Sequence, residues 1–182
     1  MPQAFSIVNF VAFQIVWFAA VIGAANGMPW AGPVAALAFA VAHLAWTNDR
    51  AADLRLLLIA LLMGLVADSL LTATGLLRFD SPWPSEHLAP AWILAMWAGF
   101  ALTLNHSMAF LRGRWWLSAL FGLVGGPLAY WGAAQGFGAV EFGESPALAL
   151  GVLALVWGIA LPLLYAAQPN AAASGFREGS AA

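Results

Sequence analysis

The residues of this chain best suited to do chemistry are two histidines and two asparagines that lie inside apolar segments. Asn9, His43, Asn105 and His106 each fall in a stretch made mostly of Ala, Leu, Val, Phe and Trp. Polar side chains are costly at such positions in a membrane and serve either helix packing or function. Because a histidine can act as a general base or as a metal ligand, these four residues form the candidate catalytic group.

A second set of polar residues could contact a substrate. Asp68 stands out, because an ionised carboxylate roughly 20 Å along a membrane helix must be paired, protonated or hydrated. Tyr130 reaches a similar depth on a later helix, and Gln14 lies within the first apolar segment. Arg112 and Arg114 lie at the rim of the bundle, where a guanidinium could bind a phosphate. These five residues are the candidate substrate-binding group.

Each candidate also has a purely structural interpretation. A lone histidine in a membrane helix often does no more than donate a hydrogen bond to a neighbouring helix. Asn9 and Gln14 fit that interpretation better than a catalytic one. His106 has the stronger case for function, because Thr103 and Ser107 surround it with further donors and acceptors.

The composition excludes several other kinds of chemistry. The chain has no Cys, and its six basic residues are all Arg. It therefore has no disulfide, no thiolate nucleophile and no lysine Schiff base. The net charge is −2 and no basic run occurs, so nucleic acid is not an expected partner. Two histidines and amides are too few good ligands for a metal site, and the sequence has no His-x-x-x-His motif, so no metal site is predicted. The sequence also indicates no particular cofactor.

The elements that must position these residues are membrane helices. Of 182 residues, 63% are hydrophobic and 8% are charged, whereas soluble domains are about half apolar and about a quarter charged. A helix needs about 20 apolar residues to cross the bilayer core. Six such stretches predict an all-α fold, a polytopic bundle of six transmembrane helices in a single transmembrane domain over residues 1–167. The expected helices cover residues 5–25, 30–47, 54–77, 89–111, 115–136 and 146–167, followed by a disordered cytoplasmic tail over 168–182.

The positions of the arginines predict the orientation of the bundle. With six spans, five of the six arginines fall on one side of the membrane, and only Arg78 falls on the other. The five are Arg50, Arg55, Arg112, Arg114 and Arg177. This positive-inside pattern predicts that the N- and C-termini are cytoplasmic. No basic residue precedes Arg50, so the first apolar segment is expected to be a retained helix and not a cleaved signal peptide.

The segment 115–136 carries a pattern typical of close helix packing. Gly122 and Gly126 are four residues apart, as are Gly132 and Gly136, and small residues at that spacing let helix backbones approach. These glycines could contact a membrane-protein partner or a second copy of the chain. Pro127 in the middle of the segment predicts a kink.

Three segments carry a resemblance to a known family. They are Asn9-Phe10…Gln14…Trp17, Thr103-Leu104-Asn105-His106-Ser107 and Gly125-Gly126-Pro127-Leu128-Ala129-Tyr130. They resemble a family of small bacterial inner-membrane proteins catalogued as a domain of unknown function, number 2878. The resemblance covers nearly the whole membrane region and implies a location in the bacterial inner membrane. It also implies a link to lipids, because such proteins are often encoded near lipid-modifying enzymes.

Three functions remain open from the sequence. The first is the handling or modification of a lipid at the cytoplasmic leaflet by the candidate catalytic group. The second is a small-solute or proton-coupled transporter that uses Asp68 and the segment around Pro127. The third is a non-catalytic membrane partner or scaffold that binds through the glycines of residues 115–136. The lipid bilayer is the expected surrounding in all three.

Overall fold

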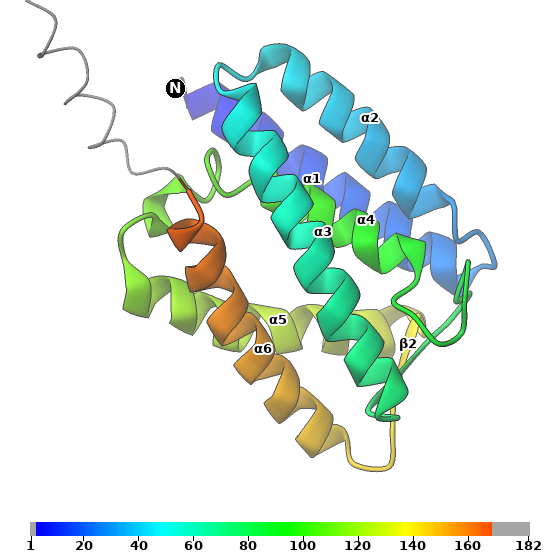
Figure 1. Cartoon of the computed structure of the whole chain (residues 1–182). Helices are drawn as coiled ribbons and strands as arrows, with labels where there is room; N and C mark the ends of the chain where they lie inside the picture. Colours follow the sequence, from blue (N-terminus) through cyan, green and yellow to red (C-terminus); the bar gives the residue numbers. More distant parts are fainter. Residues whose placement is uncertain (1–2, 169–182) are drawn as a thin grey trace, which may run out of the picture.

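The computed structural model describes residues 3–168, which form six α-helices joined by short connections (Figure 1). The helices are α1 (Gln3–Ala25), α2 (Ala31–Trp46), α3 (Arg50–Ala73), α4 (Ala91–Ala101), α5 (Trp115–Phe137) and α6 (Pro146–Ala166). A 3-10 helix over Ala109–Leu111 follows α4, and two short strands, β1 (Leu77–Phe79) and β2 (Val140–Phe142), pair in antiparallel fashion. The prediction of an all-α helical bundle is confirmed. The expected tail falls almost entirely on residues 169–182, which lie outside the described residues.

Four of these helices are long and apolar enough to cross a membrane, namely α1, α3, α5 and α6. The other two are apolar but shorter, with 16 residues in α2 and 11 in α4. At 1.5 Å per residue α4 is about 16 Å long, which is about half the thickness of the hydrocarbon core. The described residues therefore contain the six expected helices, but they do not establish six complete membrane spans.

The fourth helix was predicted too long. We expected a helix over residues 89–111, but α4 ends at Ala101 and the chain continues in turns to Met108. The amide of Thr103 donates to the carbonyl of Phe100, and the amide of His106 donates to that of Thr103, so i→i−3 bonds replace the helical pattern. The hydroxyl of Thr103 also donates to the Phe100 carbonyl. Thr, Asn and Ser compete in this way for backbone groups, which is why a run of them ends the helix.

The third helix was predicted to begin and end too late. It begins at Arg50 and ends at Ala73, not over 54–77. Its N-cap is Asp49, whose side chain accepts a hydrogen bond from the amide of Ala52 at 3.1 Å. The earlier start places Asp53 inside the first turn of α3, where its side chain is buried in the bundle.

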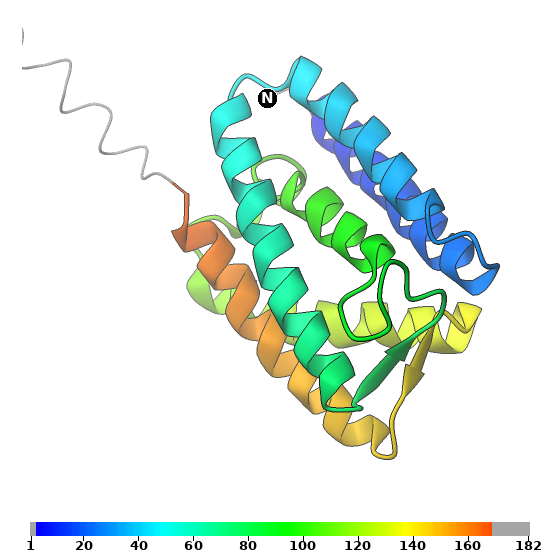
Figure 2. The same cartoon turned by 45° about the vertical axis from the view of Figure 1, so that its right-hand side comes forward.

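The helices are arranged around α4 (Figures 1 and 2). Helices α1 and α2 form an antiparallel pair on one side, and α5 and α6 form a second pair on the other. The short helix α4 packs against α1, α2 and α3. Its Trp92, Ile93 and Trp97 are almost fully buried, which makes α4 part of the core despite its length.

The pairing of α5 with α6 uses glycines that were predicted to contact a partner. A Cβ atom on Gly122 would collide with the backbone carbonyl of Trp157, and one on Gly126 would collide with the Trp157 side chain. These two glycines therefore serve the fold of the chain itself. Gly136, in contrast, would meet nothing within 4 Å in the described part of the chain.

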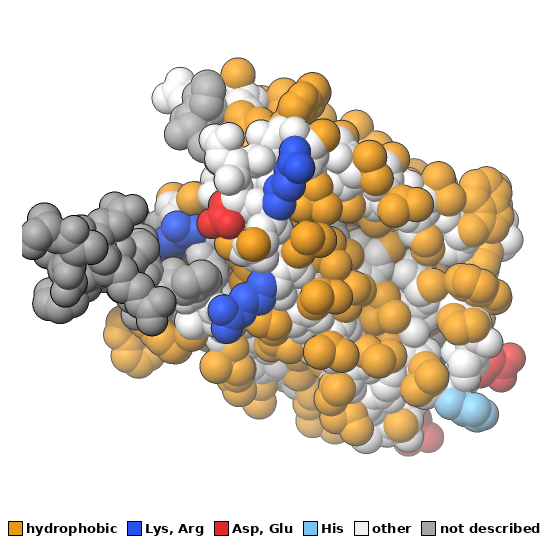
Figure 3. Space-filling view, turned by 45° about the horizontal axis from the view of Figure 1, so that its top comes forward, with side chains coloured by type: hydrophobic (Ala, Val, Ile, Leu, Met, Phe, Trp, Pro, Cys, Tyr) orange, Lys and Arg blue, Asp and Glu red, His pale blue; other side chains and the backbone are white. Residues whose placement is uncertain are grey.

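The two ends of the bundle differ in charge. The start of α3, the end of α2 and the turn after α4 lie at one end, which we call the Asp53 end, and the two strands lie at the other. Figure 3 shows arginines together with an acidic side chain near one end of the molecule, acidic and histidine side chains near the other, and apolar side chains between. The exposed apolar side chains include Leu62, Val66 and Leu155, as expected for helices that face lipid.

Candidate functional site

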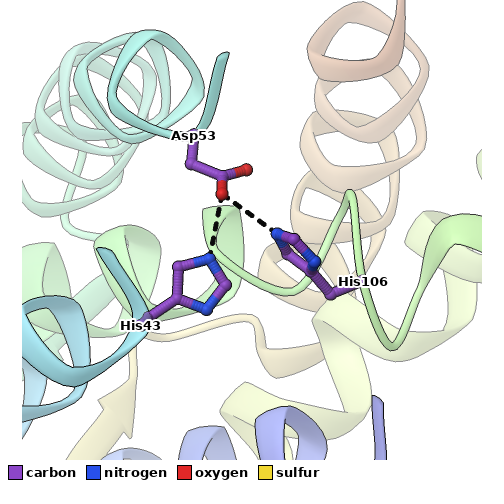
Figure 4. Close-up of side chains that lie close together, drawn as sticks. All are labelled: His43, Asp53 and His106. Carbon is purple, nitrogen blue, oxygen red and sulfur yellow. Dashed lines mark hydrogen bonds and ion pairs between the residues drawn. The ribbon is translucent and has the colours of Figure 1, made fainter. Parts of the chain in front are cut away.

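The carboxylate of Asp53 is the centre of a buried hydrogen-bond network at the Asp53 end (Figure 4). Its Oδ2 atom accepts from Nε2 of His43 and from Nε2 of His106, both at 3.0 Å, and from Oγ1 of Thr47 at 2.7 Å. Its Oδ1 atom accepts from Nδ2 of Asn105 at 3.0 Å. Asp53 is 1% exposed, and both histidines are buried. We call these residues, together with Asn9, the Asp53 cluster.

Three separate elements carry the carboxylate and the two imidazoles of the cluster. His43 lies in the last turn of α2 and Asp53 in the first turn of α3, so the tight connection between these helices brings them together. His106 comes from the turn that follows α4. The rings of His43 and His106 pack edge to face with centroids 4.5 Å apart, so the two imidazoles meet directly below the carboxylate.

Asn9 supports the cluster by bonding backbone groups that the end of α4 leaves without helical partners. Its Nδ2 atom donates to the carbonyl of Leu102 at 3.0 Å, and its Oδ1 atom accepts from the hydroxyl and amide of Ser107 at 2.6 and 3.4 Å. Tyr165 on α6 similarly donates to the carbonyl of Met108 at 2.7 Å. Irregular backbone at membrane depth requires such internal partners, because lipid offers none.

The structure thus brings together the four residues of the candidate catalytic group, His106, His43, Asn105 and Asn9. Sequence reasoning missed the residue that joins them. Asp53 falls one residue ahead of the third helix expected over 54–77, and it is not among the candidate residues. The available signal was Asp49, a good N-cap residue, which would have started the helix early enough to include Asp53.

The cluster contains atoms that could hold a metal ion. One ligand atom from each of His43, Asp53 and His106 lies within 4.8 Å of the others. Two histidines and one carboxylate are a common ligand set for transition metals. The prediction of no metal site was made on the two histidines and the amides alone, without this carboxylate.

The orientation of Asn9 nevertheless argues against metal binding through His43. The Leu102 carbonyl can only accept and the Ser107 amide can only donate, so Nδ2 of Asn9 must face the Leu102 carbonyl. The same Nδ2 lies 3.3 Å from Nδ1 of His43, which must then be an acceptor without a proton. A histidine that binds a metal through Nε2 needs the opposite arrangement, with Nδ1 donating to an acceptor.

One atom of the cluster has no hydrogen-bond partner in residues 3–168. This atom is Nδ1 of His106, which is buried. The ring of Phe5 lies against both imidazoles, with centroids 5.3 Å from His106 and 5.9 Å from His43. An orphaned polar atom inside an otherwise saturated network needs an explanation, and a catalytic role is one of those known for such atoms.

The cluster is linked to the charged rim through Asn105. The guanidinium of Arg112, which is exposed, donates to Oδ1 of Asn105. Because arginine can only donate, this contact fixes the amide so that its Nδ2 faces Asp53. Arg114 lies two residues further on, exposed at the start of α5.

Asp68 belongs to a second, separate cluster. Its Oδ2 atom accepts from the indole Nε1 of Trp97 at 2.7 Å, and its Oδ1 atom accepts from the hydroxyl of Tyr130 at 2.6 Å. The carboxyl group is 1% exposed, and Trp97 stacks on Trp157 with centroids 4.1 Å apart. Two candidate substrate-binding residues, Asp68 and Tyr130, therefore bind each other.

A cavity of about 560 Å³ lies between α1, α4, α5 and α6. Among the described lining residues, Gln14, Thr103, Ser107 and Tyr130 are polar, three tryptophans each carry an indole N–H, and the others are apolar or glycine. Of the candidate substrate-binding residues, Gln14 and Tyr130 line this cavity. Ser107 is the link to the Asp53 cluster, because it also donates to Asn9.

Comparison with known proteins identifies the family but no characterised relative. No curated protein and no solved structure matches the chain. The family model described as "Protein of unknown function (DUF2878)" matches residues 6–163, a range that contains the Asp53 cluster, Asp68 and the cavity. The chain therefore belongs to this family, as its resemblance predicted.

Proposed function

We propose that the protein handles a lipid at the membrane face that carries the Asp53 end. The lipid chain occupies the cavity, and the headgroup lies beside the Asp53 cluster. The observation that carries this proposal is the shared residue Ser107, which lines the apolar cavity and donates to Asn9 of the cluster. An apolar chain in the cavity would thus end next to a group of polar side chains.

The shape and lining of the cavity support an occupant that enters from the bilayer. Its volume lies within the range of about 300–1,000 Å³ found for small-molecule sites. Four lining residues are strongly exposed on the outer surfaces of α1 and α5, so the cavity opens toward the lipid-facing side. They are Phe10, Phe18, Phe121 and Leu128. A lipid chain reaches such an opening without crossing water.

The residues near the cluster suit an anionic headgroup. Arg112 is exposed and is held by Asn105 beside the buried carboxylate. Arginine binds phosphate through charge-assisted hydrogen bonds. The excess of arginine at the Asp53 end supports the proposal that this end lies at the cytoplasmic leaflet of a bacterial inner membrane. The N-terminus would then lie on the same side.

The transporter and scaffold functions have less support. Each oxygen of Asp68 already accepts a hydrogen bond from a protein donor, and Asp68 does not appear among the described residues that line the cavity. Gly122 and Gly126 are used in the contact between α5 and α6. Neither function therefore gains a specific observation of its own.

A pair of glycine substitutions tests the proposal. Gly125 lines the cavity, and its nearest contact for an added Cβ is Phe121 at 3.8 Å, so Gly125→Leu fills the cavity without a backbone clash. Gly136→Leu on the same helix adds the same side chain at an open outer position. Each protein is purified in a mild detergent, and its co-purified lipid is quantified by mass spectrometry.

We expect the wild type and Gly136→Leu to retain bound lipid after extensive washing, and Gly125→Leu to lose most of it. Thermal unfolding of the three proteins controls for a general loss of structure. Equal lipid in all three folded proteins would mean that the cavity is not the lipid site.

A further inference from the structure

We infer that Nδ1 of His106 is the proton-accepting atom of an Asp53–His106 dyad, and that His43 is a positioning residue that does not accept the proton. The inference concerns the chemistry of the Asp53 cluster and does not depend on a lipid in the cavity. It follows from the hydrogen bonds of two side-chain amides, those of Asn105 and Asn9, and of the Asp53 carboxylate. Each step starts from a neighbouring group that can only donate or only accept.

The first step is the ionisation state of Asp53. Arg112 can only donate, so Asn105 presents its oxygen to Arg112 and its Nδ2 to Oδ1 of Asp53. Oδ2 accepts from the hydroxyl of Thr47 and lies 3.0 Å from both histidine Nε2 atoms. Both oxygens are thus acceptors, which is the arrangement of an ionised carboxylate.

The second step is the tautomer of His43. Asn9 is held by Leu102 and Ser107 so that its Nδ2 faces Nδ1 of His43. That ring nitrogen accepts a hydrogen bond, and the proton of the ring is on Nε2, where it is donated to Asp53. Both nitrogens of His43 are therefore occupied, and the ring has no free lone pair with which to accept a proton.

The third step concerns His106, which makes the same bond to Asp53 but lacks the second partner. Its Nε2 donates to Oδ2, so in the neutral ring Nδ1 carries the lone pair, and this atom is buried with no partner in residues 3–168. The residue is 7% exposed. A carboxylate on one ring nitrogen and a free lone pair on the other is the arrangement by which a buried acid orients a histidine base.

The chemical class of the missing partner follows from the lone pair. The lone pair requires a hydrogen-bond donor, and the donor from which a histidine base ordinarily removes a proton is an O–H group. In the resting state this O–H group donates to Nδ1. In the transfer step the O–H bond breaks, its electron pair stays on oxygen, and the proton forms a new bond to Nδ1. The positive charge on the imidazole is then stabilised by the carboxylate of Asp53.

Nitrogen NMR of the full chain in detergent micelles tests this inference, because the chain has only three histidines. Long-range ¹H–¹⁵N correlations of ¹⁵N-histidine-labelled protein distinguish a protonated ring nitrogen from an unprotonated one. We expect His43 and His106 each to show one tautomer, with the proton on Nε2. His87, exposed in a loop, serves as the internal control with mixed tautomers.

The signals are assigned with His87→Gln and His43→Gln, so His106 is identified by elimination even if its own substitution prevents folding. A resting His106 with a proton on Nδ1, in the Nδ1-protonated tautomer or in the imidazolium, would overturn the inference. The role of Asp53 is tested with Asp53→Ala, in which we expect His106 to lose its single tautomer. If that variant does not fold, the wild-type spectrum still decides the assignment of the accepting atom.

Zinc addition separates the dyad from a metal centre. We expect Zn²⁺ to leave the His43 and His106 signals unchanged. Stoichiometric uptake of zinc with a change of both rings to the Nδ1-protonated tautomer would instead show a metal site and overturn the dyad.

The source of the O–H group is determined with two lipids. Diacylglycerol carries a free hydroxyl, and its acetyl ester does not. A shift of the Nδ1 signal with diacylglycerol, but not with its acetyl ester, identifies a lipid hydroxyl. A hydrogen-bonded Nδ1 that neither lipid affects identifies water, and both outcomes support the dyad. An Nδ1 signal without any hydrogen bond in every sample contradicts the proposed partner.

Discussion

His106 and Asp53 are 53 residues apart in the chain, yet Nε2 of the histidine lies 3.0 Å from Oδ2 of the carboxylate, and both residues are buried. This contact exists because α4 ends early and a non-helical turn carries His106 to the start of α3. The same carboxylate binds His43, Thr47 and Asn105. The stability of this end of the bundle should therefore depend on Asp53 more than on any neighbouring acid.

We expect Asp53→Ala to destabilise the protein by about 3 kcal/mol or more, because it leaves several buried donors without an acceptor. Asp49→Ala provides the matched control, since Asp49 is an exposed N-cap four residues earlier, and its loss should cost about 1 kcal/mol. Both variants are compared with the wild type by unfolding in detergent micelles. An equal effect of the two substitutions would show that the carboxylate of Asp53 does not hold the cluster together.

Two alanine substitutions on α5 should differ in their effect on stability. Gly122→Ala should destabilise the bundle by about 1–3 kcal/mol, because its methyl group meets the backbone of Trp157, which cannot move aside as a flexible side chain can. Gly136→Ala should leave stability unchanged or raise it by up to about 1 kcal/mol, because alanine favours the helix and the position is open. Unfolding measurements in detergent micelles check both.

This pair of variants also changes how a scaffold function should be tested. Gly126 packs against Trp157 of the same chain, so a large side chain at this position would disturb the fold itself, and a loss of function there would not indicate a lost partner. A substitution at Gly136 probes the outer surface without that complication. If Gly122→Ala were neutral, the contact between α5 and α6 would have to be looser than the structure shows.

Asp68 and Tyr130 should be coupled in a double-mutant cycle. Tyr130→Phe removes the donor to Oδ1 of a buried carboxyl group, and we expect a loss of about 1–3 kcal/mol. In the Asp68→Asn background the effect of Tyr130→Phe should differ by about 0.5–3 kcal/mol. The measurement is the unfolding free energy of the four proteins.

The control for this cycle is Tyr165→Phe, because Tyr165 donates to the Met108 carbonyl and shares no described hydrogen bond with Asp68. Asp68→Asn and Tyr165→Phe should add to within about 0.5 kcal/mol. Additivity of Asp68→Asn with Tyr130→Phe as well would mean that the two side chains do not interact in solution.

The proposed orientation predicts opposite labelling of two single cysteines, and the chain has no native Cys to interfere. Asn48→Cys lies in the exposed connection between α2 and α3, and His87→Cys lies in the exposed loop before α4. A membrane-impermeant maleimide added to intact spheroplasts should label His87→Cys only. After permeabilisation of the membrane it should label both variants. Labelling of Asn48→Cys in intact spheroplasts would reverse the orientation, and labelling of both would place these two residues on one side.

The sequence by itself determined those properties that depend on local composition. Apolar stretches separated by Gly, Pro and charged residues specify how many helices form, because each stretch must bury its backbone hydrogen bonds within itself. The polar residues inside these stretches, including Asn9, His43 and His106, stand out for the same reason. The family resemblance in these segments was also confirmed.

Only the tertiary structure decided which of these residues meet and in what arrangement. The end of α4 at Ala101 depends on side chains from α1 and α6, Asn9 and Tyr165, that bond the freed backbone groups from outside the segment. The central role of Asp53 depends on where α3 begins and on how it is rotated, and the packing of neighbouring helices sets that rotation. The lone pair on Nδ1 of His106 depends on the contact of Nε2 with Asp53, which another helix supplies. Such contacts join residues distant in sequence, and no local pattern specifies them.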